Sequence, residues 1–208
     1  MGTARRHAGR DRRRLRRAIA LLSDTITHLA MTARPVRPPL PMPQAKLALM
    51  RVEECTASFY RYLYNTVGEP WVWYVRRLWS DERLRLWLAR PEIEVSVLYV
   101  AGVPAGFFEI ERPASGETEL CYFGLVPDFI GRGIGAWFLH QAVEGAWRPP
   151  TARLIVHTST FDHPRALALY RRAGFRVSHR QKADFDDPRL TGALPRTLQH
   201  PLLPPLPA

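Results

Sequence analysis

The 208-residue chain is long enough for one ordinary domain with a tail and too short for two full domains. Its hydrophobic fraction of 46% suits a packed core and excludes wholesale disorder, and two cysteines, Cys55 and Cys121, are too few for a disulfide framework. No apolar run approaches the roughly 20 residues that span a bilayer. We therefore expect a cytoplasmic protein.

The net charge of +11 is concentrated at the N-terminal end of the chain. Residues 1–38 hold ten arginines against two aspartates, which accounts for +8 of the total and leaves +3 for residues 39–208. Such a leader suits an electrostatic contact with nucleic acid or a membrane surface. Because the remainder is only slightly basic, we do not expect nucleic acid to be a partner of the domain itself.

Residues 1–45 are expected to form a basic leader and a proline-rich linker, disordered or loosely helical. Apolar residues between 12 and 30 recur at steps of four and three, which is typical of an amphipathic helix: Leu15, Ile19, Leu22, Ile26 and Leu29. Arginines in its first turns oppose the helix dipole, so this helix would form only against an anionic surface. Alternatively the leader has no function and translation begins at Met31. Five prolines within 34–43 predict an extended linker.

The domain is expected over residues 46–205, with helices and strands in alternation. Helices are predicted over 52–64, from the cap Ser80 to just before Pro91, over 133–146 and over 164–172. Strands are predicted over 94–100, 106–111, 117–126, 154–158 and 175–179, with a further edge strand over 197–203. This order indicates an α/β fold with a central sheet of mixed direction.

A glycine-rich loop lies between the apolar strand at 117–126 and the helix at 133–146. Gly131, Gly133 and Gly135 alternate with larger residues, so the backbone can turn tightly and direct its N–H groups into one concavity. Together with the positive end of the helix these amides suit a pyrophosphate, and Arg132 adds charge. A turn without a ligand is the alternative. A Rossmann loop does not fit, because the preceding strands form a meander, and the Gly-Lys-Ser/Thr of a Walker loop is absent.

Two motifs together resemble the GNAT superfamily of N-acetyltransferases over residues 46–205. The first is Leu125-Val126-Pro127 leading into Gly131-Arg132-Gly133-Ile134-Gly135, and the second runs from Ala166 through Tyr170 to Gly174-Phe175. The chain departs from the family pattern at Ile130, where Arg or Gln is usual, and at His163, where Asn is frequent. His163 is expected either to contact the cofactor arm or to cap the following helix.

The resemblance implies the GNAT fold, with a mixed but mostly antiparallel central sheet flanked by helices, and transfer of an acetyl group from acetyl-CoA to a primary amine. It further implies direct attack within a ternary complex and no metal. A backbone N–H near Leu125 or Val126 would stabilise the oxyanion. The cofactor-binding residues that it implies are Leu125, Val126, Gly131, Arg132, Gly133, Ile134, Gly135, Ala136 and His163.

Two side chains are the catalytic candidates that the resemblance implies. Glu119 occupies a position similar to that of the general-base glutamate in the family members that carry one, with Glu109 and Glu111 as rivals. Tyr170 is similar to the general acid that protonates the leaving thiolate. The structural alternatives are a solvent-facing carboxylate for Glu119 and a core aromatic for Tyr170.

The acceptor amine cannot be read from the sequence. Four aromatic residues lie between the first two predicted helices, where they would either line an acceptor groove or pack the helices on the sheet: Trp71, Trp73, Tyr74 and Trp79. A small-molecule or peptide amine is the expected partner, and a homodimer is compatible with the resemblance. Two other functions stay open: a non-catalytic acyl-CoA sensor of the same fold, and a protein tethered to nucleic acid by the leader.

Overall fold

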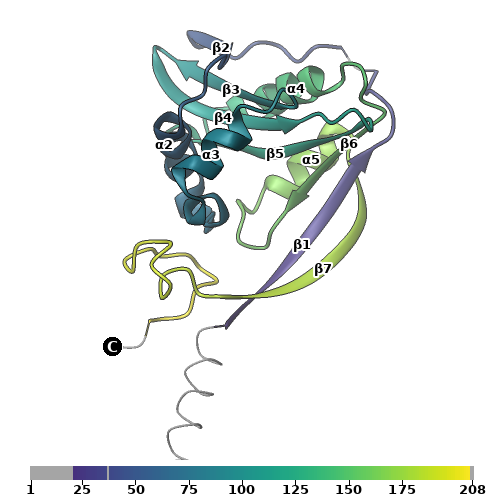
Figure 1. Ribbon diagram of the computed structural model, residues 1–208. Coiled ribbons are helices and arrows are strands. Elements are labelled where there is room, and N and C mark those ends of the chain that lie inside the picture. The colour runs from purple at the N-terminus through teal and green to yellow at the C-terminus, as the bar shows by residue number, and fades with distance from the viewer. Residues whose placement is uncertain (1–20, 37, 207–208) are drawn as a thin grey trace, which may run out of the picture.

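The computed structural model describes residues 21–36 and 38–206, which build one seven-stranded sheet in the order β2-β3-β4-β5-β6-β1-β7 (Figure 1). The strands are β1 (Leu21–Met31), β2 (Leu47–Arg51), β3 (Ile93–Val100), β4 (Val103–Glu111), β5 (Glu117–Leu125), β6 (Arg153–Thr158) and β7 (Arg176–Asp186). Neighbouring strands are antiparallel except β5 and β6, which are parallel. The predicted mixed, mostly antiparallel sheet is confirmed.

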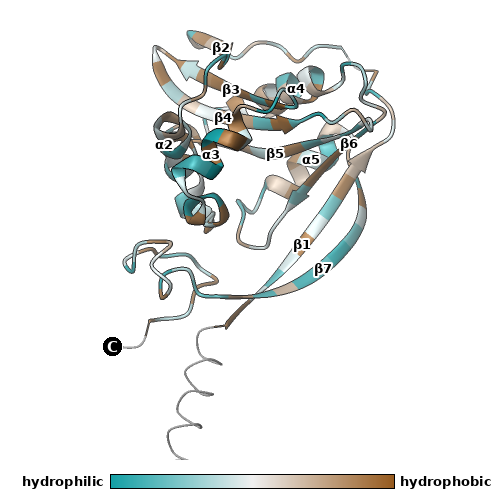
Figure 2. Cartoon of the chain, in the orientation of Figure 1, coloured by the Kyte–Doolittle hydropathy of each residue, from teal (hydrophilic) through white to brown (hydrophobic). Residues whose placement is uncertain are grey.

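Helices cover both faces of this sheet. They are α2 (Ala57–Gly68), α3 (Asp81–Leu88), α4 (Ile134–Ala146) and α5 (Ala166–Ala173), with short 3-10 turns η1 (Glu69–Trp71), η2 (Val75–Leu78) and η3 (Pro127–Phe129). One buried cluster lies between the sheet and α4 and α5, and a second lies on the other face under α2 and α3. Figure 2 shows hydrophobic residues along β3 and β4 and mostly hydrophilic ones along β7.

Local signals set most helix boundaries. The predicted cap Ser80 accepts a hydrogen bond from the Arg83 N–H at 3.2 Å at the start of α3. Helix α2 begins at Ala57, later than the predicted residue 52, because the chain is still paired with β3 there: the Val52 N–H donates to the Val95 carbonyl at 2.9 Å. The preceding strand β2 was not predicted. As expected for the linker, residues 34–36 and 38–43 form neither helix nor strand.

The expected helix over 12–30 is wrong for residues 21–31, which form strand β1. This strand lies inside the sheet, paired with β6 through Thr27–Met31 and with β7 through Leu21–Ala30. Strand β7 pairs with β1 along Leu21–Ala30 and β6 pairs with its other edge at Thr27–Met31, and this pairing overrides the helical spacing of its apolar residues. The folded unit therefore includes Leu21, well before the predicted boundary at residue 46, and a chain starting at Met31 would lack β1. The rest of the expected helix, and the leader's proposed nucleic-acid contact, lie outside the described residues.

The C-terminal end of the chain packs against the outer end of β1 and β7. The strand predicted over 197–203 is wrong, since those residues form turns and irregular backbone. A buried ion pair fixes this segment: Arg189 Nη2 lies 2.6 Å from Asp187 Oδ2 and also donates to the Pro204 carbonyl at 2.7 Å. Leu194 packs there against Leu22 and Phe161. The segment thereby holds the outer end of the β1–β7 pair in place.

A single core substitution measures how much the fold depends on β1. Leu29 is 1% exposed and belongs to the cluster under α4 and α5, whereas Leu21 on the same strand is 45% exposed. We expect Leu29→Ala to lower the free energy of unfolding by about 2–5 kcal/mol, because it leaves a cavity in that cluster. Leu21→Ala, the matched control, should change it by about 0.5 kcal/mol or less. Denaturant unfolding gives both values, and equal small effects would show that β1 is not part of the stable core.

Candidate active site

The parallel strands β5 and β6 create the main cavity because they separate. They pair only where Glu117–Glu119 lie beside Arg153–Ile155. Beyond this point a cavity of about 690 Å³ opens between them. Its walls are the rest of β5, the glycine-rich loop, helix α5, the segment around η1, and the outer parts of β1 and β7.

The glycine-rich loop forms one end of this cavity with its backbone. Gly131 and Gly133 have φ angles of 83° and 76°, a left-handed conformation that favours glycine. A Cβ at either position would meet no atom within 4 Å, so the requirement for glycine is conformational and not steric. Helix α4 starts directly after Gly133, and its first N–H groups have no partner within the helix. The arrangement suits an anion.

Of the nine residues predicted to bind the cofactor, six line the cavity: Leu125, Gly131, Gly133, Gly135, Ala136 and His163. The other three are engaged elsewhere. Ile134 is buried in the core under α4, and the Arg132 guanidinium stacks 4.8 Å from the Phe129 ring centroid. Val126 packs toward α2, and its N–H donates to the Ala105 carbonyl at 2.9 Å. That amide is therefore not free to stabilise an oxyanion.

Tyr170 reaches the cavity from helix α5. Its ring is 6% exposed and contacts Phe123 and Phe175 edge-on. No hydrogen bond engages its hydroxyl within the described parts of the chain. Burial raises the pKa of this hydroxyl, with a smaller contribution from the charge of Asp162. At neutral pH the group is protonated and available as a donor.

His163 lies at the cavity and just before helix α5. Its Nδ1 accepts a hydrogen bond from the Arg165 N–H at 3.1 Å, next to the first residue of α5, and its ring also lines the cavity. The ring meets Trp71 edge-on, with centroids 5.0 Å apart. Burial lowers the pKa of His163, and the charge of Arg165 lowers it further. The side chain is therefore a neutral imidazole at physiological pH.

Glu119 does not line the cavity, but it contacts a histidine that does. Its Oε1 lies 3.1 Å from Nδ1 of His157 on β6. The hydrogen bond to Glu119 is the main cause that raises the pKa of His157, against the opposing effect of burial. His28 of β1 follows in the same row, with its ring centroid 5.9 Å from that of His157.

Sequence reasoning missed His157. A signal was present, since the buried residues Leu154, Val156 and Thr158 alternate with it along β6 and place it on the opposite face. The sequence does not show that Glu119 lies beside His157, because the pairing of β6 with β5 cannot be predicted from local pattern. The dyad of Glu119 and His157 is thus a product of the sheet topology.

The rival carboxylate Glu109 is a structural residue. It is fully buried under α2 and α3, where Tyr60 and Trp87 donate hydrogen bonds to it and Arg76 Nη2 lies 2.8 Å from its Oε1. The Arg76 guanidinium is stacked 3.8 Å from the Trp79 ring centroid. Burial raises the pKa of Glu109, and the charge of Arg76 opposes that shift.

The second rival, Glu111, forms an ion pair with Arg90 at 2.8 Å. One side-chain ligand atom each of Glu111, Glu119 and Cys121 lies within 4.8 Å of the others. Neither Glu109 nor Glu111 lines the cavity.

The predicted aromatic group divides between the two roles proposed for it. Trp71, Trp73 and Tyr74 line the cavity, whereas Trp79 packs with Arg76 and with the edge of Trp87. The indole N–H of Trp73 donates to Asp162 at 3.0 Å.

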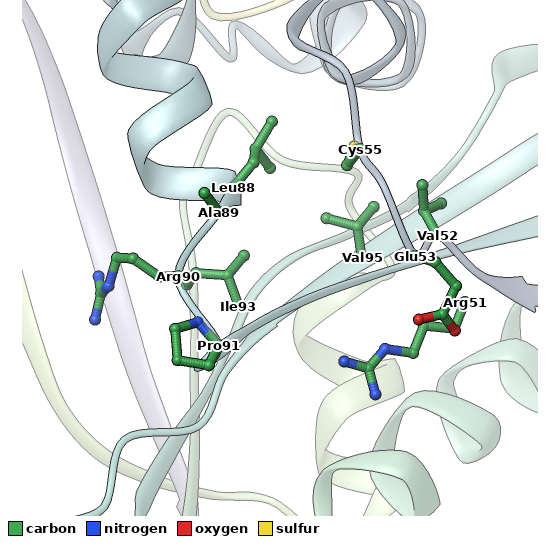
Figure 3. Close-up of a pocket in the computed structure, with 10 residues that line it drawn as sticks. All are labelled: Arg51, Val52, Glu53, Cys55, Leu88, Ala89, Arg90, Pro91, Ile93 and Val95. Atoms are coloured by element: carbon green, nitrogen blue, oxygen red, sulfur yellow. The ribbon is translucent and has the colours of Figure 1, made fainter.

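A second, smaller pocket of about 200 Å³ lies between the end of α3 and strands β2 and β3 (Figure 3). Arg51, Cys55 and Arg90 are among the residues that line it, and none of the residues predicted for the active site does.

Comparison with known proteins agrees with this architecture. The model of the acetyltransferase (GNAT) family matches residues 53–175, and a search of curated proteins gives no match. Two similar solved structures are GCN5-related N-acetyltransferases. The one from Sphaerobacter thermophilus has a TM-score of 0.56 and 20% identity, over 85% of this chain and 56% of that one. The one from Kribbella flavida has a TM-score of 0.55 and 17% identity, over 83% and 63%.

An aminoglycoside acetyltransferase from an uncultured soil metagenomic sample is also similar, with a TM-score of 0.51 and 14% identity over 62% of this chain and 87% of that one. At these identities the likeness shows the fold alone. The chain spans less than two thirds of the length of the Sphaerobacter and Kribbella structures. Among the helices of the described residues, none is both long and apolar enough to cross a membrane.

The buried pair of Arg76 and Glu109 predicts a large stability difference between neighbouring arginines. Arg76→Met leaves Glu109 buried without its cation, so we expect a loss of about 3–5 kcal/mol in the free energy of unfolding. Arg77→Met removes an ion pair whose partner Glu69 is 40% exposed, and should cost about 1 kcal/mol or less. Denaturant unfolding of the two variants measures this contrast, and similar losses would mean that the buried pair is not a major support of the fold.

Proposed function

We propose that this chain, which belongs to the acetyltransferase (GNAT) family, transfers an acetyl group from acetyl-CoA to a primary amine by direct attack in a ternary complex. The observation that carries the proposal is that three kinds of group line one cavity. It has an anion-binding backbone loop at Gly131 and Gly133, a protonated hydroxyl at Tyr170, and an imidazole at His157 held by Glu119.

The residues present fit acetyl-CoA. The loop amides and the start of α4 suit the pyrophosphate, and Ile130 in place of a longer polar residue leaves this backbone cradle intact. The edge of β5 beyond Glu119 faces the cavity and is not paired with β6, so its backbone groups can hydrogen-bond an extended arm with amides. When bound, the cofactor would supply the activated acetyl thioester.

Two proton transfers fall to side chains of this chain. His157 takes a proton from the ammonium form of the acceptor, which frees the nitrogen lone pair to form the new C–N bond. Glu119 fixes the imidazole through Nδ1 and leaves Nε2 for the proton. Tyr170 donates its proton to the sulfur as the C–S bond breaks, and the second proton that the nitrogen loses on becoming an amide restores the tyrosine hydroxyl. In this assignment His157 is the base and Glu119 is its hydrogen-bond partner, whereas Glu119 itself was predicted as the base from the sequence.

Binding and turnover are tested together on the full chain. Isothermal titration with acetyl-CoA and with CoA should give micromolar affinity, and a panel of amines should release free thiol for at least one acceptor. Tyr170→Phe should lower turnover about tenfold or more while CoA affinity stays nearly unchanged, because only the proton donor is removed.

Three outcomes decide between the hypotheses. Binding without thiol release across a broad panel would favour the non-catalytic sensor. Absence of binding would contradict the proposal outright. Equal turnover for Tyr170→Phe and the parent would remove Tyr170 from the mechanism.

The pH dependence of kcat/KM tests the base. His157 must be neutral to act, and its pKa is raised above 6.5, so the rate should rise with pH through a midpoint above that value. Glu119→Gln removes the main cause of the shift and should move the midpoint to lower pH. His157→Gln should abolish this rise of kcat/KM with pH and should lower the rate about 100-fold or more. His140→Gln, on α4 and away from the cavity lining, is the control; an unchanged profile for His157→Gln would exclude the dyad.

A further inference from the structure

The cavity has a second end, away from the glycine-rich loop, that the cofactor does not require. Strands β1 and β7 run side by side past the edge of the sheet (Figure 1), and Ile26 and Phe185 of this arm line the cavity together with Tyr74. With the cofactor's pyrophosphate at the glycine-rich loop, the side chains of the arm are left to contact the acceptor. The chemistry of this end therefore selects the acceptor, and an acceptor class inferred from it rests on the proposed function.

Aromatic and apolar side chains dominate this end. Tyr74 is stacked on Phe185, with centroids 5.4 Å apart and ring planes 15° from parallel. Phe161 meets the Phe185 ring edge-on, with centroids 5.6 Å apart, and Leu194 of the C-terminal segment packs against Phe161 and its neighbours. The wall is thus supported from outside. Such a wall favours a flat or apolar body.

Two carboxylates of the same wall, Asp24 and Asp162, are held by neutral donors. Asp24 is 8% exposed and accepts hydrogen bonds from the Ser159 hydroxyl and from the Thr160 N–H and hydroxyl at 2.6–2.9 Å. Asp162 accepts from Trp73, from the Thr158 hydroxyl and from the Ser159 N–H at 2.8–3.0 Å. Within residues 21–36 and 38–206, neither forms an ion pair with a lysine or arginine.

The charges of these two carboxylates act on groups that line the cavity, whose lining also includes Asp184 and, on the side of α5, Arg165 and Arg172. The hydrogen bond that His157 donates to Glu119 and the charge of Glu119 raise the pKa of His157 most, and the charges of Asp162 and Asp24 raise it further. Burial is the main cause that raises the pKa of Tyr74, and the charge of Asp24 is the next. A partly desolvated negative field of this kind is complementary to a positive charge on the ligand. Each carboxylate already accepts three hydrogen bonds from the protein, so few acceptors are left for a ligand with many donors.

We propose that the acceptor is an amine with a single positive charge on an aromatic body, of the arylalkylamine type. The ammonium group would enter the field of Asp24 and Asp162 near His157, and the ring would lie against Tyr74 and Phe185. A polyhydroxylated amine with several charges is disfavoured, because its hydroxyls would lose water against apolar rings without gaining partners. A lysine side chain is also disfavoured, because it brings no ring that could lie against Tyr74 and Phe185.

A matched set of acceptors tests this class on the full chain. Thiol release is measured with 2-phenylethylamine, with hexylamine, with kanamycin and with a short lysine-containing peptide. We expect kcat/KM for 2-phenylethylamine to exceed that for hexylamine by about tenfold or more, as an aromatic and cation–π contribution allows. Kanamycin and the peptide should be weaker still. Titration of 2-phenylethylamine into the CoA-saturated protein gives a readout that does not depend on turnover.

Two variants separate the charge from the ring. Asp24→Asn should raise KM for 2-phenylethylamine about tenfold while kcat changes by about threefold or less, because the charge acts in binding. Tyr74→Leu should raise KM for 2-phenylethylamine and leave that for hexylamine nearly unchanged. Glu82→Gln, at an exposed position on α3, is the charge-matched control. CoA affinity and circular dichroism establish that each variant is folded.

The outcomes distinguish this inference from the proposed function. Thiol release that favours kanamycin or the peptide would overturn the arylalkylamine class and leave the acetyltransferase standing. Equal KM values for the parent and both variants would also overturn it. Absence of thiol release from every amine would contradict the proposed function itself and the acceptor class with it.

Discussion

The separation of β5 from β6 is the constraint on which the rest of the structure depends. Parallel strands that part must leave backbone groups without partners, which is costly unless something else satisfies them. Strand β6 is paired on its other edge, where Thr27–Met31 of β1 lie in antiparallel register, and its edge toward β5 is paired only at Arg153–Ile155. On β5 the edge that faces the cavity stays open from Leu120 to Leu125. The cavity is therefore a gap in a sheet with a polar backbone edge, and its other walls carry both apolar and charged or polar side chains.

Strand β1 links this gap to its surroundings. Its inner half completes the sheet beside β6, and its outer half pairs with β7 and reaches past the cavity. Asp24 on the outer half holds the loop after β6 through Ser159 and Thr160, and that loop leads into the helix that carries Tyr170. A residue far in sequence from the candidate catalytic side chains thus fixes the loop that precedes one of them. This explains why a segment outside the matched region 53–175 belongs to the site.

Much of the fold was predictable because its signals are local. Alternation gave β3 and β4, Ser80 gave the start of α3, and glycine spacing gave the loop before α4. The failures concern long-range pairing. The spacing of Leu22, Ile26 and Leu29 is that of a helix, and only pairing with β6 and β7, with a register shift between His28 and Leu29, makes the segment a strand. Glu119 was a candidate through the family resemblance, whereas its partner His157 follows only from the pairing of β6 with β5.

The contrast between Glu109 and Glu119 shows how packing assigns different roles to the same residue type. A bulge between Glu109 and Ile110 shifts the register, so that Glu109 lies opposite Tyr122 while Glu111 lies opposite Glu119. Helices α2 and α3 cover Glu109, and Arg76 neutralises it, which makes it an internal support. Glu119 lies one strand further, beside β6, and stays 31% exposed with an imidazole as its partner. A carboxylate that is accessible and coupled to a titrating group can take part in proton transfer, and one sealed against a guanidinium cannot.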